Sequence, residues 1–294
     1  MVEYSSDKKV AIILTVYNPD VVELVDNLRT YVDQVDVVVL SDNSDNVLAQ
    51  AAVRKLVSVS PKIVLNQLFN NVGIAKAQNL GLRIALDLGC DFFIEMDQDS
   101  KLPPSYVARL LNCFDSLVEE GRLVGGVGPL AVKKGSDEIY DGLNRAKGVI
   151  EVDYTLSSGF LVSRHAMERI GEKNEDLFID FVDWEWCWRS RALGYQIFID
   201  TTLEIGHMLG DGHKLFFGFK IGMPSPIRHY YQYRNFIYLL SKSFVPGKWK
   251  IKYFLIMGSK LMIVPLILDR KMRRLQYIFK GIKDGMLKKT GKIS

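Results

Sequence analysis

Phe92-Phe93-Ile94-Glu95-Met96 runs directly into Asp97-Gln98-Asp99-Ser100, so a mostly apolar stretch ends in two spaced carboxylates. The apolar stretch predicts a buried strand whose carboxylates point toward whatever binds at its carboxyl end. In open α/β sheets, ligands bind at that edge. Two carboxylates there would hold a hard divalent cation, and the cation would hold a diphosphate. The motif also occurs in acidic turns, so its meaning depends on the rest of the chain.

The composition is that of a globular protein with a sizeable core. The chain has 294 residues, of which 48% are hydrophobic and 24% are charged. That length suits one large α/β domain with an appendage, or two domains. Cys90, Cys113 and Cys187 have neither paired spacing nor histidines at metal-ligand spacing, which indicates reduced thiols in the cytosol. Residues 1–9 are polar and lead straight into a predicted strand, so we expect no signal peptide.

The net charge of +4 is unevenly distributed along the chain. Residues 248–294 contain thirteen Lys and Arg and two acids, which gives +11 and leaves −7 for residues 1–247. An acidic body with a basic tail is not the footprint of a general nucleic-acid-binding protein. We therefore expect no nucleic-acid partner.

The basic tail also contains an apolar run, residues 253–268, which Lys260 and Pro265 interrupt. The run is too short and too impure to predict a membrane span. Because Lys and Arg flank it on both sides, we expect residues 245–294 to form an amphipathic helical segment on an anionic membrane surface. The alternative is a buried C-terminal helix pair with a solvated basic face.

Strand-like and helix-like segments alternate over the first 130 residues. The expected strands are apolar runs at residues 10–16, 35–40, 63–65, 92–96 and 123–127. Helical patterns occupy residues 19–32, 73–89 and 104–119. The alternation predicts an α/β fold with a Rossmann-like, mainly parallel sheet covered by helices on both faces. We expect one catalytic domain, residues 1–244, followed by the tail.

Polar residues gather where the predicted strands end or the next helix begins. They are Thr15, Tyr17 and Asn18, then Asp42 and Asn43, then Asn71 and Gly73, then Asp97 and Asp99. The carboxyl ends of parallel strands share one edge, so these side chains should converge there. Singly, each is also a common turn or helix-cap residue. The sequence contains no dinucleotide fingerprint after the first strand, no P-loop and no nucleophile elbow.

Taken together, these segments resemble glycosyltransferase family 2, whose members have the GT-A fold. The resemblance covers residues 8–240 and rests on residues 15–19, 41–44, 70–75 with Asn79, 97–100 and 178–189. The Asp97-Gln98-Asp99-Ser100 form and the strings at 182–189 and 225–235 look most like the bacterial rhamnosyltransferase branch. Enzymes of that branch use dTDP-L-rhamnose to build cell-surface polysaccharides.

For the donor, the resemblance implies a nucleotide pocket lined by Thr15, Tyr17, Asp42, Asn71 and Gly73. It implies that Asp97 contacts the ribose or the sugar. Asp99 and His207 would bind a divalent metal, Mg²⁺ or Mn²⁺, that holds the diphosphate. Arg228 and Arg234 would reach the diphosphate, or one of them would pair with a structural acid. A satisfied polar role is the alternative for His207.

For the acceptor, the resemblance implies that Asp183 is the general base of an inverting transferase. Such a reaction needs one carboxylate near the acceptor hydroxyl and a cation or basic group near the departing diphosphate. Val182 stands where the family usually has a glutamate, so Asp180 and Glu185 remain alternative bases. The residues expected to touch the acceptor are Trp184, Glu185 and Trp186, although part of this helical string must be core.

The predicted function is the transfer of L-rhamnose from dTDP-L-rhamnose to a lipid-linked glycan, on the inner face of a bacterial cell membrane. A GT-A transferase that uses another nucleotide sugar, such as a UDP-hexose, is the alternative within the class. An aspartyl-phosphate phosphatase would have Thr or Val where Lys101 stands and its motif on the first strand. A catalytically dead scaffold would have lost a motif carboxylate. The oligomeric state is left open.

Overall fold

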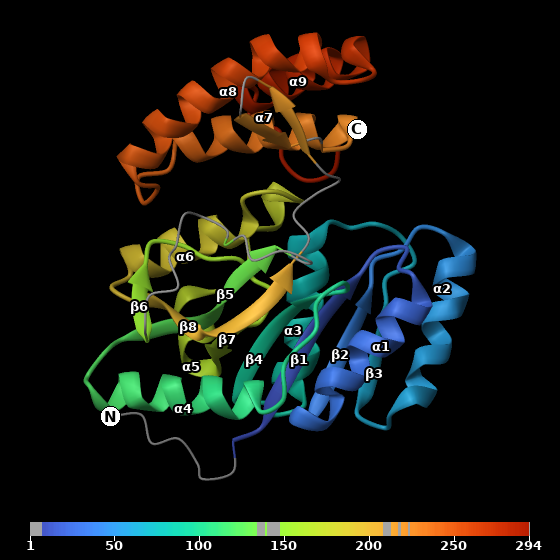
Figure 1. The fold of residues 1–294 in the computed structure, drawn as a ribbon, viewed down its shortest axis with the longest axis vertical. Helices are drawn as coiled ribbons and strands as arrows, with labels where there is room; N and C mark the ends of the chain where they lie inside the picture. The colour runs from blue at the N-terminus through green and yellow to red at the C-terminus, as the bar shows by residue number, and fades with distance from the viewer. Residues whose placement is uncertain are drawn as a thin grey trace.

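In the computed structural model, which describes residues 8–133, 139, 148–207, 213–216, 219–222 and 224–293, an eight-stranded sheet runs through the middle of the molecule (Figure 1). Its strand order is β3-β2-β1-β4-β7-β5-β8-β6. The strands are β1 (Val10–Val16), β2 (Val37–Asp42), β3 (Ile63–Gln67), β4 (Phe92–Asp97), β5 (Val124–Lys133), β6 (Val149–Val152), β7 (Phe160–Ser163) and β8 (Gln196–His207). Of residues 207, 213–216, 219–222 and 265 only the backbone is described.

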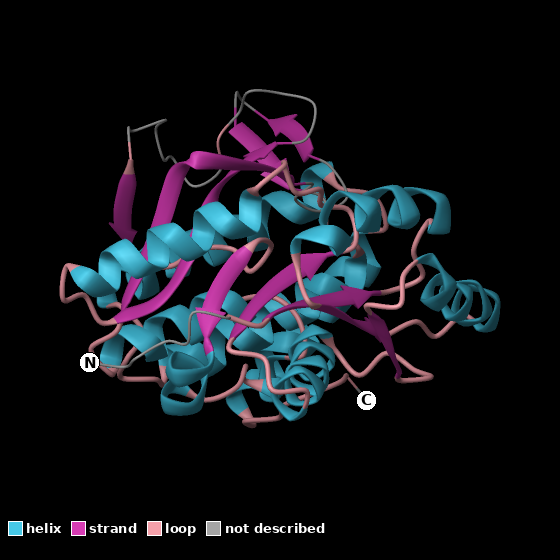
Figure 2. Ribbon diagram, turned by 90° about the horizontal axis from the view of Figure 1, so that it is seen from below, coloured by secondary structure: helices cyan, strands magenta, loops and turns pink. Residues whose placement is uncertain are grey.

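The sheet is mainly parallel, which confirms the prediction. β3, β2, β1 and β4 run in one direction, and β5 and β8 share it. β7 lies antiparallel between β4 and β5, and β6 pairs antiparallel with β8 at the edge. β7 thus joins the first half of the sheet to the second. Figure 2 shows the strands lying between layers of helices.

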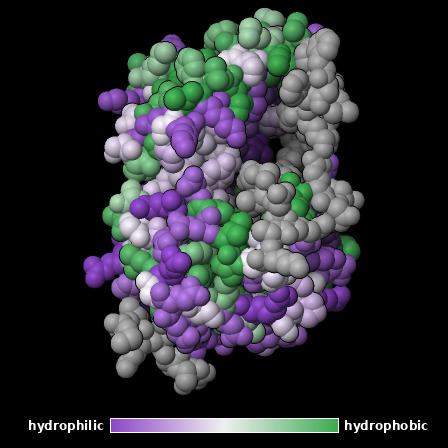
Figure 3. Space-filling model, turned by 60° about the vertical axis from the view of Figure 1, so that its left-hand side comes forward, coloured by the Kyte–Doolittle hydropathy of each residue, from purple (hydrophilic) through white to green (hydrophobic). Residues whose placement is uncertain are grey.

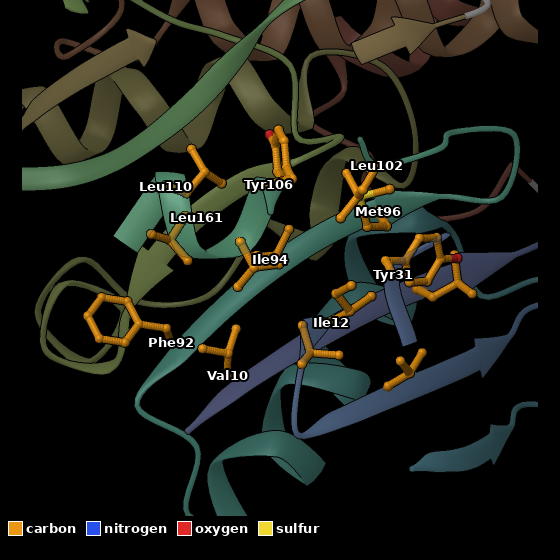
Figure 4. Close-up of a cluster of buried hydrophobic side chains, with 14 of the residues drawn as sticks. Val10, Ile12, Tyr31, Phe92, Ile94, Met96, Leu102, Tyr106, Leu110 and Leu161 are labelled. Atoms are coloured by element: carbon orange, nitrogen blue, oxygen red, sulfur yellow. The ribbon is translucent and has the colours of Figure 1, made fainter. Parts of the chain in front are cut away.

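Helices cover both faces of the sheet because side chains alternate along each strand. One face packs against α1 (Val21–Tyr31) and α4 (Tyr106–Glu119), and the other against α3 (Ile74–Asp87), α5 (Arg164–Ile170) and α6 (Val182–Ala192). Figure 4 shows the first cluster, where Ile12 and Ile94 of the sheet lie near Tyr31 of α1 and Leu110 of α4. Helix α2 (Val47–Arg54) is preceded by its N-cap residue Asn46, whose side chain accepts hydrogen bonds from two backbone N–H groups of the first turn.

The C-terminal helices form a second layered body beside the sheet (Figure 1). They are α7 (Pro226–Leu240), α8 (Gly247–Ile267) and α9 (Lys271–Met286), and a hairpin of β9 (His213–Phe216) and β10 (Phe219–Gly222) precedes them. One core joins Trp188 of α6, Phe236 of α7, Trp249 of α8 and Ile278 of α9. The expected boundary at residue 244 therefore lies inside a shared core.

Gly281 is what allows α9 to lie so close to α7. A Cβ at this position would be 2.5 Å from the backbone oxygen of Tyr230, a distance that side chains do not tolerate. At Gly285, one turn later, a Cβ would lie 2.9 Å from Ile237 Cβ and 3.1 Å from Arg234 O, which is also a close approach. The tail is thus held to the body by close backbone packing, a geometry nearer to the buried helix pair than to a detachable segment.

After α9 the chain returns to the sheet body in a short segment, residues 289–293, that we name the C-terminal strap. Its backbone is held by Arg234, which donates to Lys289 O (3.3 Å) and Gly291 O (3.2 Å). The Ile293 N–H donates to the hydroxyl of Tyr231 (3.0 Å), and Lys292 Nζ donates to Asn71 O (3.0 Å). The strap therefore ends beside the loop that opens α3.

Candidate active site

The carboxyl ends of β1, β2 and β4 meet at one edge of the sheet. In the strand register Thr15 is level with Ser41 of β2 and with Asp97 of β4. One step beyond β1, the Tyr17 N–H donates to Gln98 Oε1 at 2.7 Å, which ties the two strand-end loops together. Thr15, Tyr17 and Asp97 accordingly lie along one short stretch of this edge.

Tyr17 presents a partly exposed ring at the mouth of this edge. Its hydroxyl donates to Asp45 Oδ2 at 2.9 Å, and Asn18 Nδ2 donates to Asp45 Oδ1, also at 2.9 Å. Burial and the neighbouring Asp45 carboxylate raise the pKa of Tyr17, so the phenol stays neutral. A neutral ring fixed by its hydroxyl is a surface on which a nucleotide base can stack.

The loop between β3 and α3 is held in place by side-chain hydrogen bonds to the end of β2. Asn43 Oδ1 accepts from the Val72 N–H (2.8 Å), and Asn43 Nδ2 donates to Asn71 Oδ1 (3.2 Å). Asn71 Oδ1 also accepts from the Gly73 N–H (3.0 Å). Gly73 has φ +91° and faces Phe178 so closely that a Cβ would lie 2.6 Å from the ring, so glycine is required here.

Asp42 lies deeper than the neighbouring donor candidates. Its side chain is fully buried at the end of β2. Oδ1 accepts from the Ser44 N–H (3.1 Å), and Oδ2 accepts from Gln67 Nε2 at 3.4 Å. Asp42 thus orders the turn after β2. The predicted hydrogen bond to the nucleotide base would have to be made by this buried carboxylate.

Negative charge is concentrated where β4 ends. Burial, together with the nearby carboxylates of Asp183 and Asp99, raises the pKa of Asp97 to about 7. Asp97 and Asp99 come from the strand end, whereas Asp183 comes from the first turn of α6. The end of β4 and the start of α6, which are distant in sequence, thereby place three carboxylates within electrostatic reach of one another. A divalent cation bound there would offset this negative charge.

Among the side chains that the structure describes, no three His, Cys, Asp or Glu residues already form a metal-binding group. His207 ends β8, where its backbone pairs with Lys133 of β5, and its side chain lies outside the described part. The expected pairing of His207 with Asp99 at a metal thus stays a prediction.

Of the three possible bases, Asp183 is the most accessible. Its side chain is 26% exposed, against 11% for Asp180 and 3% for Glu185. Asp180 receives two hydrogen bonds from the Arg228 guanidinium, and Glu185 is paired with Arg189 at 3.1 Å. All three carboxylates have a basic partner, which for Asp183 is Lys173 at 3.8 Å, so the greater exposure of Asp183 is what favours it as the base.

The tryptophans of α6 divide between interior and site. Trp186 is fully buried and its indole N–H donates to Gly171 O at 2.8 Å. Together with the burial of Glu185, this leaves neither residue exposed to an acceptor, contrary to the expected acceptor contacts. Trp184 is partly buried and packs against Tyr154 and Tyr253. Among the expected acceptor residues, Trp184 is the one that is only partly buried.

Arg228 and Arg234 both hold protein groups. Arg228 pairs with Asp180, which matches the structural-acid alternative. Arg234 is buried, and its guanidinium donates to the carbonyl oxygens of Asp176 (2.8 Å) and Leu177 (3.0 Å) as well as to the C-terminal strap. The Arg234 guanidinium is thus occupied by backbone carbonyls, and the expected diphosphate contacts of both arginines stay predictions.

Sequence reasoning did not identify Asn235 and Lys173 as residues of the site. Asn235 Nδ2 donates to three carbonyl oxygens, those of Leu177, Ile179 and Asp180. It thereby fixes the loop before α6, in which Asp180 has φ +68°. Asn235 stands in the string that carries the resemblance, which was the available signal. Lys173 is buried between Glu95 and Asp183, and a lone lysine in a loop gives no such signal.

Comparison with known proteins places this fold and site in a known class. No family model matches the chain. It is 32% identical to the dTDP-rhamnosyl transferase RfbF of Shigella flexneri over an alignment 297 positions long, which covers 96% of each chain. Among solved structures it resembles S. aureus TarS 1–349 in complex with UDP-GlcNAc, with a TM-score of 0.58, 15% identity and coverage of 95% and 81% of the two chains. It also resembles GalNAc-T7 with UDP, GalNAc and Mn²⁺, with a TM-score of 0.56, 12% identity and coverage of 97% and 57%.

The fold and the carboxylate-lined strand edge therefore define a glycosyltransferase of the GT-A class. The two structural neighbours establish the fold alone, because their identities are low. The curated relative goes further, since its similarity spans nearly the whole length of both chains. The chain belongs to the family of the bacterial dTDP-rhamnosyl transferases, as its resemblance to glycosyltransferase family 2 predicted.

Proposed function

We propose that the protein transfers L-rhamnose from dTDP-L-rhamnose, with inversion, to a hydroxyl of a lipid-linked glycan. The observation that carries the proposal is the 32% identity to a dTDP-rhamnosyl transferase over 96% of both chains. The arrangement of the residues supports the proposal. Tyr17 and Asn71, which would face the nucleotide, lie in the loops at the sheet edge, whereas the carboxylate of Asp183 lies at the start of α6.

In the proposed reaction, the acceptor hydroxyl attacks the anomeric carbon from the side opposite the diphosphate. Asp183 accepts the hydroxyl proton, and the bond from the anomeric carbon to the diphosphate oxygen breaks with its electron pair on the nucleotide. Tyr17 and the loop at Asn71 and Gly73 hold the nucleotide. Trp184 lines the acceptor side, next to the base.

Asp97 and Asp99 fit a divalent cation, Mg²⁺ or Mn²⁺. Carboxylate oxygens are the ligands that these ions prefer. Burial and the neighbouring carboxylates of Asp183 and Asp99 raise the pKa of Asp97, and a bound cation would offset this concentration of negative charge. When bound, the ion would supply stabilisation of the charge that develops on the departing diphosphate.

The donor is tested by thermal shift with dTDP-L-rhamnose, UDP-glucose and UDP-GlcNAc, each with and without Mn²⁺. A ligand that binds the folded state raises the unfolding temperature by mass action. We expect the largest rise with dTDP-L-rhamnose and Mn²⁺, and loss of its Mn²⁺-dependent part in Asp99→Ala. A larger rise with a UDP-hexose would refute the rhamnose assignment and leave the reaction class in place.

The base is tested by Asp183→Asn, which keeps the shape of the side chain but cannot take the proton. We expect turnover to fall by roughly a hundredfold or more, with donor affinity nearly unchanged because the base serves the acceptor. Asp180→Asn, in the loop that leads into α6, is the matched comparison. Near-normal turnover of Asp183→Asn would show that another carboxylate is the base.

We further propose that α8 attaches the enzyme to the inner face of the cell membrane, close to its lipid-linked acceptor. Five apolar residues of α8, each between 64% and 69% exposed, share one face at helical spacing: Ile251, Phe254, Leu255, Met262 and Leu266. Figure 3 shows hydrophobic residues gathered at the end of the molecule that the C-terminal helices form. Lys248 and Lys252 are exposed on the first turns of the same helix.

Such a face suits an interfacial helix, and no helix within the described residues is long and apolar enough to cross a membrane. The test is sedimentation with vesicles of phosphatidylglycerol and phosphatidylcholine. Phe254→Ser/Leu255→Ser should weaken binding by about tenfold or more, since each fully buried side chain contributes ~1.5–3 kcal/mol. The control is Val47→Ser/Leu48→Ser, an equally exposed apolar pair on α2. Equal binding by both variants and by the wild type would contradict membrane attachment through α8.

A further inference from the structure

Lys173 is a charged residue in the interior of the catalytic body. Its side chain is 4% exposed, in the segment between α5 and the short helix Glu175–Leu177. Nζ lies 3.1 Å from Glu95 Oε2 and 3.8 Å from Asp183 Oδ1, and 5.0 Å above the ring centre of Trp186. A buried ammonium is costly unless it is paired, so its position between two carboxylates calls for an explanation.

The backbone of Lys173 is fixed as firmly as its side chain. Asn79 of α3 donates through Nδ2 to Lys173 O and accepts through Oδ1 from the Lys173 N–H, both at 2.9 Å. Asn79 is itself buried and also donates to Glu175 Oε1 at 3.1 Å. This two-point contact fixes the backbone of Lys173, and the ion pair with Glu95 of β4 fixes the position of its ammonium group.

The lysine retains its charge in this position. Burial alone would favour the neutral amine, but the carboxylates of Glu95 and Asp183 outweigh burial and raise the pKa of Lys173. The other titratable group facing it is the thiol of Cys187, whose own pKa is raised to about 12 by burial and which is therefore neutral. Lys173 is consequently an ammonium at neutral pH, beside Asp183 and beside Glu95, whose own pKa burial raises to about 7.

We propose that Lys173 is a positioning residue for the general base: anchored by Glu95, its ammonium holds Oδ1 of Asp183 so that Oδ2 faces the acceptor hydroxyl. This inference rests on the proposed function, in which Asp183 accepts the proton. Oδ2 gains the proton of the hydroxyl while Lys173 keeps all of its own. When Asp183 becomes neutral in the reaction, Lys173 remains paired with Glu95, so no buried ammonium is left without a partner.

The competing explanation is that Lys173 has a purely structural role, in which it links α6 to the sheet by contacting Trp186 of α6 and Glu95 of β4. Both explanations predict lower stability on substitution, so stability cannot separate them. They differ in turnover. A positioning role predicts a fall in kcat with unchanged donor affinity, because a displacement of about 1 Å can cost ~10²-fold in rate. A purely structural role predicts that the folded fraction turns over normally.

The experiment compares Lys173→Met/Glu95→Gln with Glu95→Gln as its reference. Methionine has nearly the shape of the lysine stem, and glutamine removes the carboxylate that would otherwise remain unpaired, so the pair isolates the contact to Asp183. We expect kcat of the double variant to be ten- to a hundredfold below that of the reference, with the donor dissociation constant within about twofold. If the double variant does not fold, Glu95→Met/Lys173→Met takes its place, because apolar replacement of a buried ion pair is often neutral for stability.

Asp183→Asn is then added to each background. If Lys173 acts through Asp183, the loss of the base should cost much less in the Lys173→Met/Glu95→Gln background than in the reference, because its positioning is already lost. Unchanged kcat in the double variant, or fully additive losses, would overturn the role of Lys173 while leaving the base assignment intact. Normal turnover of Asp183→Asn alone would instead overturn the proposed base.

Discussion

Asp97→Asn should stabilise the ligand-free protein at neutral and alkaline pH while destroying its activity. The wild-type carboxyl has its pKa raised from 3.8 to about 7 by burial and by the carboxylates of Asp183 and Asp99. The folded protein therefore holds a proton there that the unfolded chain has released, and its stability falls as the pH rises from about 4 to 7. At ~1.4 kcal/mol per pH unit, the full penalty above pH 7 is ~4 kcal/mol.

Asparagine removes this penalty because it carries no charge at any of these pH values. Since Asp97 is only partly buried, we expect about half of the full value, ~2 kcal/mol, or about 4 °C in the unfolding temperature of a chain of this size. The assay is thermal unfolding of both proteins from pH 4.5 to 8.5 without metal. The difference should be small at pH 4.5, grow up to pH 7 and remain constant above it.

Adding Mn²⁺ with the donor should reverse the order of stability. The wild type should gain from the ligands, whereas Asp97→Asn should gain little. A variant that is less stable than the wild type at pH 8 would refute the reasoning, since it would mean that the charged form of Asp97 is stabilised in the folded protein. A gain of the same size at every pH would equally refute it, because the effect would not follow the titration of this carboxyl.

Three other substitutions test the packing and the charges of the structure. Gly281→Ala should lower the unfolding temperature by an amount corresponding to ~1–3 kcal/mol, because a Cβ there meets the Tyr230 backbone at 2.5 Å; Gly258→Ala, which faces open space, should not. His229 lies against Arg274, and burial together with this guanidinium lowers the pKa of the His229 imidazole to about 4. The wild type should therefore lose up to ~3 kcal/mol as the pH falls from 6.5 to 4, and His229→Gln should flatten that loss in acid unfolding curves. Arg234→Lys should cost ~3 kcal/mol in denaturant unfolding by removing bonds to backbone carbonyls, yet leave donor affinity in calorimetry unchanged; a selective loss of donor affinity would restore its predicted diphosphate role.

The sheet and the gathering of polar residues at one of its edges were predictable because their signals are local. Continuous apolar runs gave β1 and β4, and the polar residues after them lie where strand ends must lie. The strand β7 was not predicted, since Phe160–Ser163 is a run of four residues directly followed by the helix α5, too short to show a period. The antiparallel insertion depends on pairing with β4 and β5, which no single segment reveals.

The parts of the site that escaped prediction depend on contacts between distant segments. From the sequence alone, Lys173 would be taken for a surface residue. The structure places Glu95 of β4 and Asp183 of α6 on either side of it. Arg234 reads as a phosphate ligand until the carbonyl groups around it are known. For the tail, Gly281 and Gly285 at a spacing of four were the available sign that α9 packs closely on another helix.

The contact between Lys292 and Asn71 joins positions 221 residues apart. At a synthesis rate of roughly 5–20 residues per second, the loop at Asn71 leaves the ribosome about 10–40 s before its partner exists. During that interval α7 lacks the helix that covers Tyr230 and Tyr231, while the apolar face of α8 is already emerging. Until α9 is made, the nascent chain thus exposes Tyr230 and Tyr231 together with the apolar face of α8, and apolar surface exposed in this way favours aggregation.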